Sequence, residues 1–367
     1  MDASPGHPEL LDAFARQAVW CREPAPFSAR VLERSRLWLM GPAPAQAAAA
    51  AVLAAAAPDP LAAAVALRWL AGLHHLALLG LQPWAALWPP SAAPLTDSGL
   101  DVALDAAIAT AWAQQRPLLQ AALARPPQTN EVQRSAALLP GLLHVAAQTG
   151  LPLALLEIGA SAGLNLWCDR YRHDHGVWAW GPTQSPLTLQ SDWCGPAPPL
   201  QTPLQIVRRA GCDASPVDLV QAGEALRLAS FVWADQRERL ARLHAARQIT
   251  AACNAAQGVR VQAARAADFL RQALQSRQHG ETAVLMHSVV WQYIAAEEQA
   301  DITAQMQTAG RQADAALPLA WLRFEPPAPD RAAELRCRVW RGGDGDGVDR
   351  LLARCHPHGS RIDWILN

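Results

Sequence analysis

The sequence predicts an all-helical N-terminal domain followed by an α/β domain, whose mostly parallel sheet ends in an antiparallel C-terminal hairpin. Three observations support this fold class. The chain has 367 residues, more than the roughly 250 to 300 at which a single hydrophobic core stops growing. Apolar residues make up 51% of it and charged residues 17%, as in a folded globular protein. Near Gly150 the pattern changes from helical spacing to short apolar segments that alternate with helices.

Residues 1–150 carry helical spacing, interrupted by prolines, and show no strand signal. The alanine-rich stretch from Ala45 to Ala57 predicts one helix, because alanine is the best helix former, and Leu61 to Leu81 predicts another. His74 and His75 fall within the second helix, where we expect ordinary core or surface residues.

Residues 151–367 are expected to form the α/β domain. Short apolar segments there alternate with helical patterns, as in a parallel sheet. The expected strands are Leu153 to Ile158, Gln205 to Arg209, Val259 to Ala263, Ala283 to His287, Leu319 to Phe324, Leu335 to Trp340, and Leu351 to Cys355 or Arg361 to Ile365.

Two segments interrupt this pattern. The stretch from His173 to Pro203 is rich in proline and tryptophan, and we expect an irregular insertion because proline disfavours a regular helix. The loop GGDGDG, Gly342 to Gly347, separates the last strands, which we expect to pair as an antiparallel hairpin. This loop lacks the spacing and the closing glutamate of a calcium site, so it is expected to be a plain turn.

Charge and cysteine usage argue against several functional classes. The formal net charge is −1, so the basic excess of a nucleic-acid-binding protein is absent. The seven cysteines are scattered without a C-x-x-C pair, which argues against a zinc or redox centre and fits a reduced compartment. The N-terminus lacks a signal-peptide pattern, and the longest apolar run, Ala47 to Ala57, is far shorter than the roughly 20 residues of a membrane span. We therefore expect a cytoplasmic protein with a small-molecule or protein substrate, without metal, membrane or nucleic acid.

The segment LALLEIGASAGLNL, Leu153 to Leu166, carries the strongest functional signal. A buried strand runs into an acidic residue and a turn of small residues, and a helix follows. Small residues let the backbone approach a ligand closely, and the start of a helix offers unpaired N–H groups. The candidate binding residues are Glu157, Gly159, Ala160, Ser161, Gly163 and Asn165.

Three interpretations compete for this segment. The dinucleotide pattern G-x-G-x-x-G is not met, because Ser161 and Leu164 replace two of its glycines. The hydrolase elbow G-x-S-x-G is met literally, with Ser161 as nucleophile, yet such an elbow follows several strands and this strand is expected to be the first of its sheet. The partners for that serine would be Asp330 or Asp344 and His356 or His358.

The third interpretation is a Rossmann-like methyltransferase that uses S-adenosylmethionine. E-I-G-A-S-A-G resembles the E/D-x-G-x-G-x-G pattern that opens such enzymes, with one departure at Ser161. The resemblance implies a second acid at the end of the next strand for the ribose hydroxyls, where the sequence has Asp213. It also implies adenine contact by Asp268 and a site facing the transferred methyl group at His287 and Ser288.

Longer segments resemble an uncharacterised bacterial family, domain of unknown function 2332, over nearly the whole chain. They are LLEIGASAGLNLWCDRYR, AGCDASPVD, FVWADQRERLARL, LMHSVVWQYI, WLRFEP and QTNEVQRSAALLP. The resemblance supports the fold more than the function, because the family carries no established activity. In YRHDHG, His173 and His175 replace expected aromatic residues, which argues against a metal site there.

The most favoured function is an S-adenosylmethionine-binding, methyltransferase-like protein. His287 is the candidate general base. Asn130 and Glu131 of the segment QTNEVQRS are expected to close over the pocket, with Arg134 pairing an acid to hold them. The methyl acceptor is left open, and the alternatives are the serine hydrolase described above and a non-catalytic ligand-binding protein.

Overall fold

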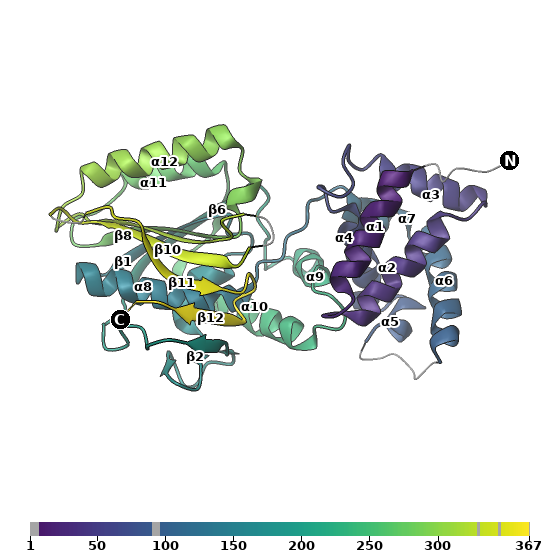
Figure 1. Cartoon of the computed structure of the whole chain (residues 1–367), viewed down its shortest axis with the longest axis horizontal. Helices are drawn as coiled ribbons and strands as arrows, with labels where there is room; N and C mark the ends of the chain where they lie inside the picture. The colour runs from purple at the N-terminus through teal and green to yellow at the C-terminus, as the bar shows by residue number, and fades with distance from the viewer. Residues whose placement is uncertain (1–6, 90–95, 329–330, 344–345, 367) are drawn as a thin grey trace. The chain divides into compact units, whose positions relative to one another are not determined.

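The structure is a computed structural model that describes residues 7–89, 96–328, 331–343 and 346–366. It combines an N-terminal helical region with a nine-stranded, mostly parallel sheet that ends in antiparallel strands, as predicted (Figure 1). By its contacts the chain divides into two units. Unit 1 comprises Met1–Thr129 and Val220–Ala241, and unit 2 comprises Asn130–Leu219 and Arg242–Asn367.

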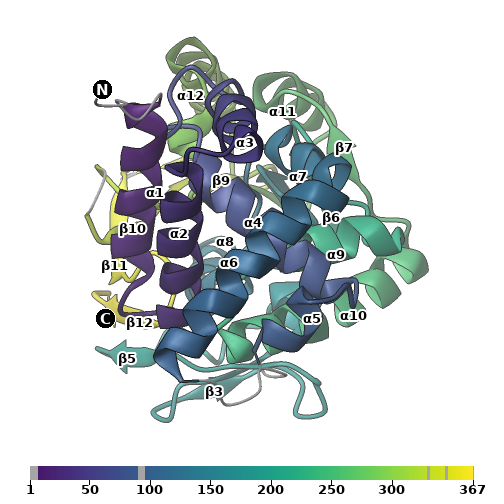
Figure 2. The same cartoon turned by 90° about the vertical axis from the view of Figure 1, so that its right-hand side faces the viewer.

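Unit 1 is built from helices, and Figure 2 shows α1 and α2 lying side by side. Its helices are α1 (Pro8–Cys21), α2 (Pro26–Leu39), α3 (Pro44–Ala54), α4 (Val65–Leu78), α5 (Trp84–Leu87), α6 (Asp97–Gln114), α7 (Arg116–Leu123), α9 (Ala222–Ser230) and the start of α10 (Arg237–Gln257). The two helices predicted at 45–57 and 61–81 correspond to α3 and α4. Helix α4 starts later than expected because Ala64 has a left-handed backbone, with φ of 53°.

The segment Val220–Ala241 is tied to the N-terminal helices by specific contacts. Asp235 accepts hydrogen bonds from the backbone N–H groups of Phe27 (2.9 Å) and Ser28 (3.1 Å) in the first turn of α2. Such N–H groups have no partner inside the helix, so a carboxylate there stabilises it. His74 is a buried core residue, and its Nδ1 lies 3.1 Å from the Ser230 carbonyl oxygen.

Unit 2 contains the large sheet, with strand order β7-β6-β1-β8-β9-β10-β11-β12-β5. Its strands are β1 (Leu153–Ile158), β5 (Asp192–Cys194), β6 (Ile206–Asp213), β7 (Val261–Ala263), β8 (Thr282–Ser288), β9 (Leu319–Glu325), β10 (Ala333–Trp340), β11 (Arg350–Cys355) and β12 (Arg361–Trp364). All six residues of β1 are buried, as expected for a central strand with parallel neighbours on both sides.

Helices cover both faces of this sheet (Figure 1). Helices α11 (Ala266–Gln275) and α12 (Ala296–Arg311) pack together on one face, and α8 (Ser135–Thr149) packs against β9, β10 and β11 on the other. The contacts thus place α8 with the sheet and Val220–Ala241 with the helical unit, whereas the sequence analysis divides the chain at residue 150.

The C-terminal strands pair antiparallel, as expected. Strand β10 pairs with both β9 and β11, and β11 pairs with β12, so both alternatives for the last strand form. In the loop before β11, residues 344 and 345 lie outside the described part of the chain, and the amide of Gly347 donates to the Val339 carbonyl (2.8 Å).

The predicted insertion contains more regular structure than expected. Strands β2 (Arg172–Asp174), β3 (Ala179–Trp180) and β4 (Thr188–Leu189) form a small separate sheet, and β5 joins the main sheet beside β12. His173 is fully buried, and its Nε2 lies 2.8 Å from the Cys168 carbonyl oxygen. The described residues include no group of three or more His, Cys, Asp or Glu that could hold a metal ion.

A membrane-spanning segment would need a long apolar helix in the part of the chain that the structure describes. No single helix there is both long and apolar enough to cross a bilayer. Helices α2 and α3 reach the necessary length and apolar composition only when they are taken together, and a bend of 115° separates them.

Candidate functional site

The candidate site lies where the direction of strand connection reverses. Strands β1 and β8 are neighbours in the sheet, and the chain adds β6 and β7 on the side of β1 but β9 on the side of β8. Ligands of open α/β sheets bind outside the carboxyl ends of the strands at such a switch point. Glu157 of β1 and Ser288 of β8 lie at this edge.

The turn after β1 has an unusual backbone. Gly159, Ser161 and Gly163 all have left-handed backbones, with φ of 66°, 52° and 74°. For the serine this region is unfavourable, so other contacts must hold it. Asp213 supplies one such contact, because its Oδ2 accepts from the Ser161 amide (2.9 Å) while its Oδ1 accepts from the Ser215 amide (2.8 Å).

Four further amide groups of the turn are also bound within the protein. Asn130 Oδ1 accepts from the amides of Ala162 (3.1 Å) and Leu164 (3.2 Å). The Ala160 amide donates to the Cys212 carbonyl, and the Gly163 amide donates to the Ala160 carbonyl. The expectation of unpaired N–H groups is therefore wrong for residues 160 to 164, where Asp213 of β6 and Asn130 of the segment before α8 supply three of the acceptors. The element that follows is the 3-10 helix η2 (Leu164–Arg170) instead of the expected helix start.

Glu157 is the most buried acid of the site, with 2% of its surface exposed. Its Oε2 has no hydrogen-bond partner among the described residues. Burial raises its pKa well above the usual range, and the charge of Asp213 adds to this, while a hydrogen bond with Asn165 and the charge of Arg134 oppose it. Asn165 is held in turn by Ser135, whose Oγ donates to Asn165 Oδ1 (2.7 Å).

Ser161 does not have the surroundings of a hydrolase nucleophile. Its buried Oγ has no hydrogen-bond partner in the described residues, so no histidine is bonded to it as a base. Of the four residues proposed as its partners, Asp330 and Asp344 lie outside the described residues. His356 and His358 belong to the loop between β11 and β12, where His358 contacts Glu131 and His356.

His287 is enclosed at the end of β8. Its Nδ1 lies 2.6 Å from Glu325 Oε1, and the indole N–H of Trp321 donates to its Nε2 (3.1 Å). Because an indole N–H can only donate, Nε2 accepts and Nδ1 carries the proton. Both ring nitrogens are therefore engaged, the ring stacks on Trp291, and only 1% of the residue is exposed. Its role as a base stays a prediction.

Glu325 is a site residue that the sequence analysis missed. Its Oε1 accepts from His287 and from the Val290 amide (3.1 Å), and its buried Oε2 has no partner among the described residues. It ends β9, the next parallel strand after β8. The rule that polar residues at the carboxyl ends of parallel strands form the site would have found it.

The segment from Asn130 to Ser135 lies against this edge of the sheet. Asn130 binds the turn, and Arg134 Nη1 donates to the Ser288 carbonyl (3.1 Å). Glu131 is 3% exposed, and its Oε1 accepts from the Gln133 amide at the start of the 3-10 helix η1 (Val132–Arg134). The segment thus meets the candidate site, while its predicted role as a cover over a ligand stays a prediction.

Asp268 forms its side-chain contact with a residue outside the candidate site. It lies in the first turn of α11, is exposed, and pairs with Arg271 (2.8 Å). The predicted adenine contact therefore has no support from its surroundings.

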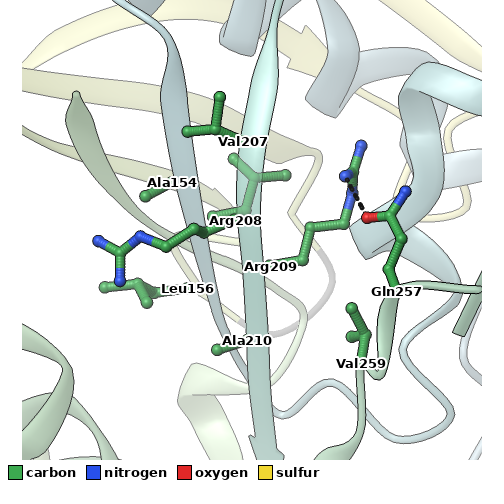
Figure 3. A pocket seen from close by; sticks show the side chains of 9 residues that line it. Ala154, Leu156, Val207, Arg208, Arg209, Ala210, Gln257 and Val259 are labelled. Atoms are coloured by element: carbon green, nitrogen blue, oxygen red, sulfur yellow. Dashed lines mark hydrogen bonds between the residues drawn. The ribbon is translucent and has the colours of Figure 1, made fainter. Parts of the chain in front are cut away.

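A hollow of about 260 Å³ lies elsewhere in unit 2, along the middle of β1 and β6 (Figure 3). Arg208 and Arg209 extend from opposite sides of β6, and Gln257 lies beside Arg209. Arg209 is committed to Asp169 (2.7 Å) and to the Leu166 carbonyl (2.8 Å). Because its lining residues come from the middle of β1 and β6, the hollow is separate from the site at the carboxyl ends of the strands.

Comparison with known proteins gives one match. Residues 11–364 match the family described as "Uncharacterized protein conserved in bacteria (DUF2332)". The chain belongs to the DUF2332 family. No curated protein and no solved structure matches the chain. Membership in DUF2332 covers both units, so the helical region and the sheet are parts of one family pattern.

Proposed function

We propose that unit 2 binds S-adenosylmethionine at the carboxyl ends of β1, β6 and β8 and transfers its methyl group to a small molecule or a protein. One observation carries the proposal. Glu157, buried at the switch point, keeps a carboxylate oxygen without a hydrogen-bond partner among the described residues. A buried polar group without a partner costs free energy, so its retention is explained when a ligand completes its bonding.

The groups around Glu157 suit a ligand of this chemistry. S-adenosylmethionine carries an ammonium group, a carboxylate, a sulfonium and ribose hydroxyls, so it presents a net positive charge and several hydrogen-bond donors. The site offers acceptors: Glu157 Oε2, Ser161 Oγ and the carboxylate of Asp213. The Asp213 carboxylate is held in place by two amides, because Oδ2 accepts from Ser161 and Oδ1 accepts from Ser215. When bound, the ligand would supply an electrophilic methyl group.

The roles of the residues follow from this match. Glu157 would bind the ammonium group, because an opposite charge favours the ionised carboxylate that burial disfavours. Asp213 would bind the ribose hydroxyls while it continues to hold the turn at Ser161. Asn165 and Ser135 would orient Glu157 through the chain of side-chain contacts described above.

The surroundings of Gly159 support the proposal less well than those of Glu157 and Asp213. A Cβ placed on it would lie 2.3 Å from Val290 Cγ2, so Val290 occupies the space above the glycine. A ligand that approaches the backbone of Gly159 must therefore displace the Val290 side chain.

Isothermal calorimetry with S-adenosylmethionine and S-adenosylhomocysteine tests the proposal. We expect a dissociation constant in the micromolar range, which corresponds to a binding free energy of about −8 kcal/mol. In Glu157→Gln the affinity should fall tenfold or more. Glu281→Gln is the matched control: Glu281 is also buried, yet it lies beside the amino end of β8 and pairs with Arg208. Absence of both heat and thermal shift at millimolar ligand would refute the proposal.

A further inference from the structure

A histidine and a buried carboxylate meet at the rim of the candidate site. His358 Nδ1, in the loop between β11 and β12, lies 3.5 Å from Glu131 Oε2. The side chain of Glu131 is 3% exposed and that of His358 is 50% exposed. The acid is thus fixed inside the protein, while the imidazole is open to solvent and to a ligand.

The loop that carries His358 is held firmly against η1. A Cβ on Gly359 would lie 2.6 Å from the Gln133 carbonyl oxygen, so the two backbones are in close contact and Gly359, with φ of 74°, must be glycine. Ser191 Oγ donates to the Gly359 carbonyl (2.6 Å), and the His358 amide donates to His356 Nδ1 (3.2 Å). These contacts position the imidazole through its backbone.

Arg134 connects this loop to the site. Its Nε donates to the Pro357 carbonyl (3.1 Å) and its Nη1 donates to the Ser288 carbonyl (3.1 Å). A single guanidinium group therefore joins the residue before His358 to the end of β8. On the other side, Glu131 follows Asn130, which binds the turn after β1.

We propose that His358 is the general base that removes a proton from the methyl acceptor, and that Glu131 is its positioning residue. The inference rests on the proposed function. A histidine whose Nδ1 faces a carboxylate presents Nε2 to the substrate, which is the arrangement of a general base. His287 lacks this freedom, because both of its ring nitrogens are engaged.

The proposed step conserves atoms and charge. The acceptor atom X of an X–H group attacks the methyl carbon, the carbon–sulfur bond breaks, and its electron pair stays on sulfur. The proton of X–H passes to Nε2 of His358. A base is needed only when the acceptor has a proton to lose, so the acceptor class is a hydroxyl or an amine and not a carboxylate.

A pair of ligands that differ in charge tests the position of His358. S-adenosylmethionine carries a positive sulfonium where S-adenosylhomocysteine is neutral, and the ammonium group is common to both, so effects of Glu157 cancel in the ratio of their dissociation constants. Protonation of His358 repels the sulfonium. We expect this ratio to rise several-fold as the pH falls from about 8 to about 5.5, the range in which imidazoles titrate.

Variants separate His358 from the charged and titratable groups around it in the described residues, which are Glu131, His356 and Arg134, the last bonded to the neighbouring Pro357 carbonyl. His358→Gln should flatten the pH dependence of the ratio, and because the side chain is half exposed the fold should survive. Glu131→Gln should reduce the size of the pH-dependent change in the ratio, because the imidazole loses the carboxylate that positions it. His279→Gln is the control, because His279 is exposed and precedes the amino end of β8.

The outcomes distinguish the two proposals. If neither ligand binds, the proposed function fails and this inference fails with it. If both bind but the ratio changes with pH equally in the wild type and in His358→Gln, the base is not His358 while the proposed function stands. Methylation of a carboxylic acid at a rate unchanged in His358→Gln would also overturn it.

Discussion

Val290 covers Gly159 at the carboxyl end of β1. A Cβ on the glycine would lie 2.3 Å from Val290 Cγ2, and the glycine has a φ of 66°. The Val290 amide donates to Glu325 Oε1 (3.1 Å), and Val289 before it has a left-handed φ of 52°. The end of β9 thus holds the residue that closes the turn after β1.

Val290→Ala should strengthen the binding of S-adenosylhomocysteine. If the ligand approaches Gly159, the wild type must first displace the valine, and the variant lacks two of its methyl groups. Burial of one such carbon is worth roughly 0.8 kcal/mol, so we expect a gain of about threefold to tenfold by calorimetry. Val177→Ala, at an exposed position in the insertion, should leave affinity unchanged. Weaker binding in Val290→Ala would mean that the ligand packs on the valine and leaves the turn covered.

Ser161→Ala separates a cofactor-site serine from a nucleophile. If the hydroxyl only hydrogen-bonds a ligand, its loss should weaken binding by roughly 0.5 to 1.5 kcal/mol. A nucleophile's loss would instead lower turnover by orders of magnitude. The Ser161 amide, which donates to Asp213, is untouched by the substitution, so the turn should keep its shape. Labelling of the wild type by a serine-reactive phosphonate, absent in the variant, would favour the hydrolase.

The sequence was sufficient to place the sheet and the two acids at its edge. Apolar runs of strand length mark β1 and β8, and in parallel strands the residues that follow such runs share one edge, which brings Glu157 and Asp213 together around the turn. The same rule applies to Glu325, but the apolar run of β9 predicts only a strand and does not single out the acid that ends it. The enclosure of His287 was harder to foresee, because the indole of Trp321 that donates to its Nε2 comes from a neighbouring strand.

Contacts between distant segments were beyond sequence reasoning. Asp235 bonds the start of α2, more than 200 residues earlier in the chain, so the segment around α9 joins the helical unit although its own pattern suits the α/β domain. The amides of the turn after β1 are a second case. Asn130, which accepts from two of them, lies outside the motif. The motif alone shows that the turn leaves amides without helical or strand partners, but it does not show which side chain accepts from them.

Glu157→Gln should change how stability depends on pH. Burial raises the pKa of Glu157 well above its ordinary value of 4.5, so the folded protein holds this proton more tightly than the unfolded chain. The resulting stability is fully present below the ordinary pKa and is lost as the pH rises through the raised one. Glutamine resembles the protonated carboxyl and never ionises. The variant should therefore become more stable relative to the wild type as the pH rises, by about 1.4 kcal/mol for each unit of pKa shift.

Urea unfolding of both proteins between about pH 5 and about pH 8 measures this difference. Glu281→Gln provides the comparison, because that buried acid has an arginine partner and its removal should destabilise the protein without the same trend. If the unfolding free energies of the wild type and Glu157→Gln differ by the same amount at every pH, the pKa of Glu157 is not raised in the folded protein. Saturating S-adenosylmethionine should remove the difference, because an ammonium group beside Glu157 favours the charged carboxylate. A difference that persists with bound ligand would place the ammonium away from Glu157.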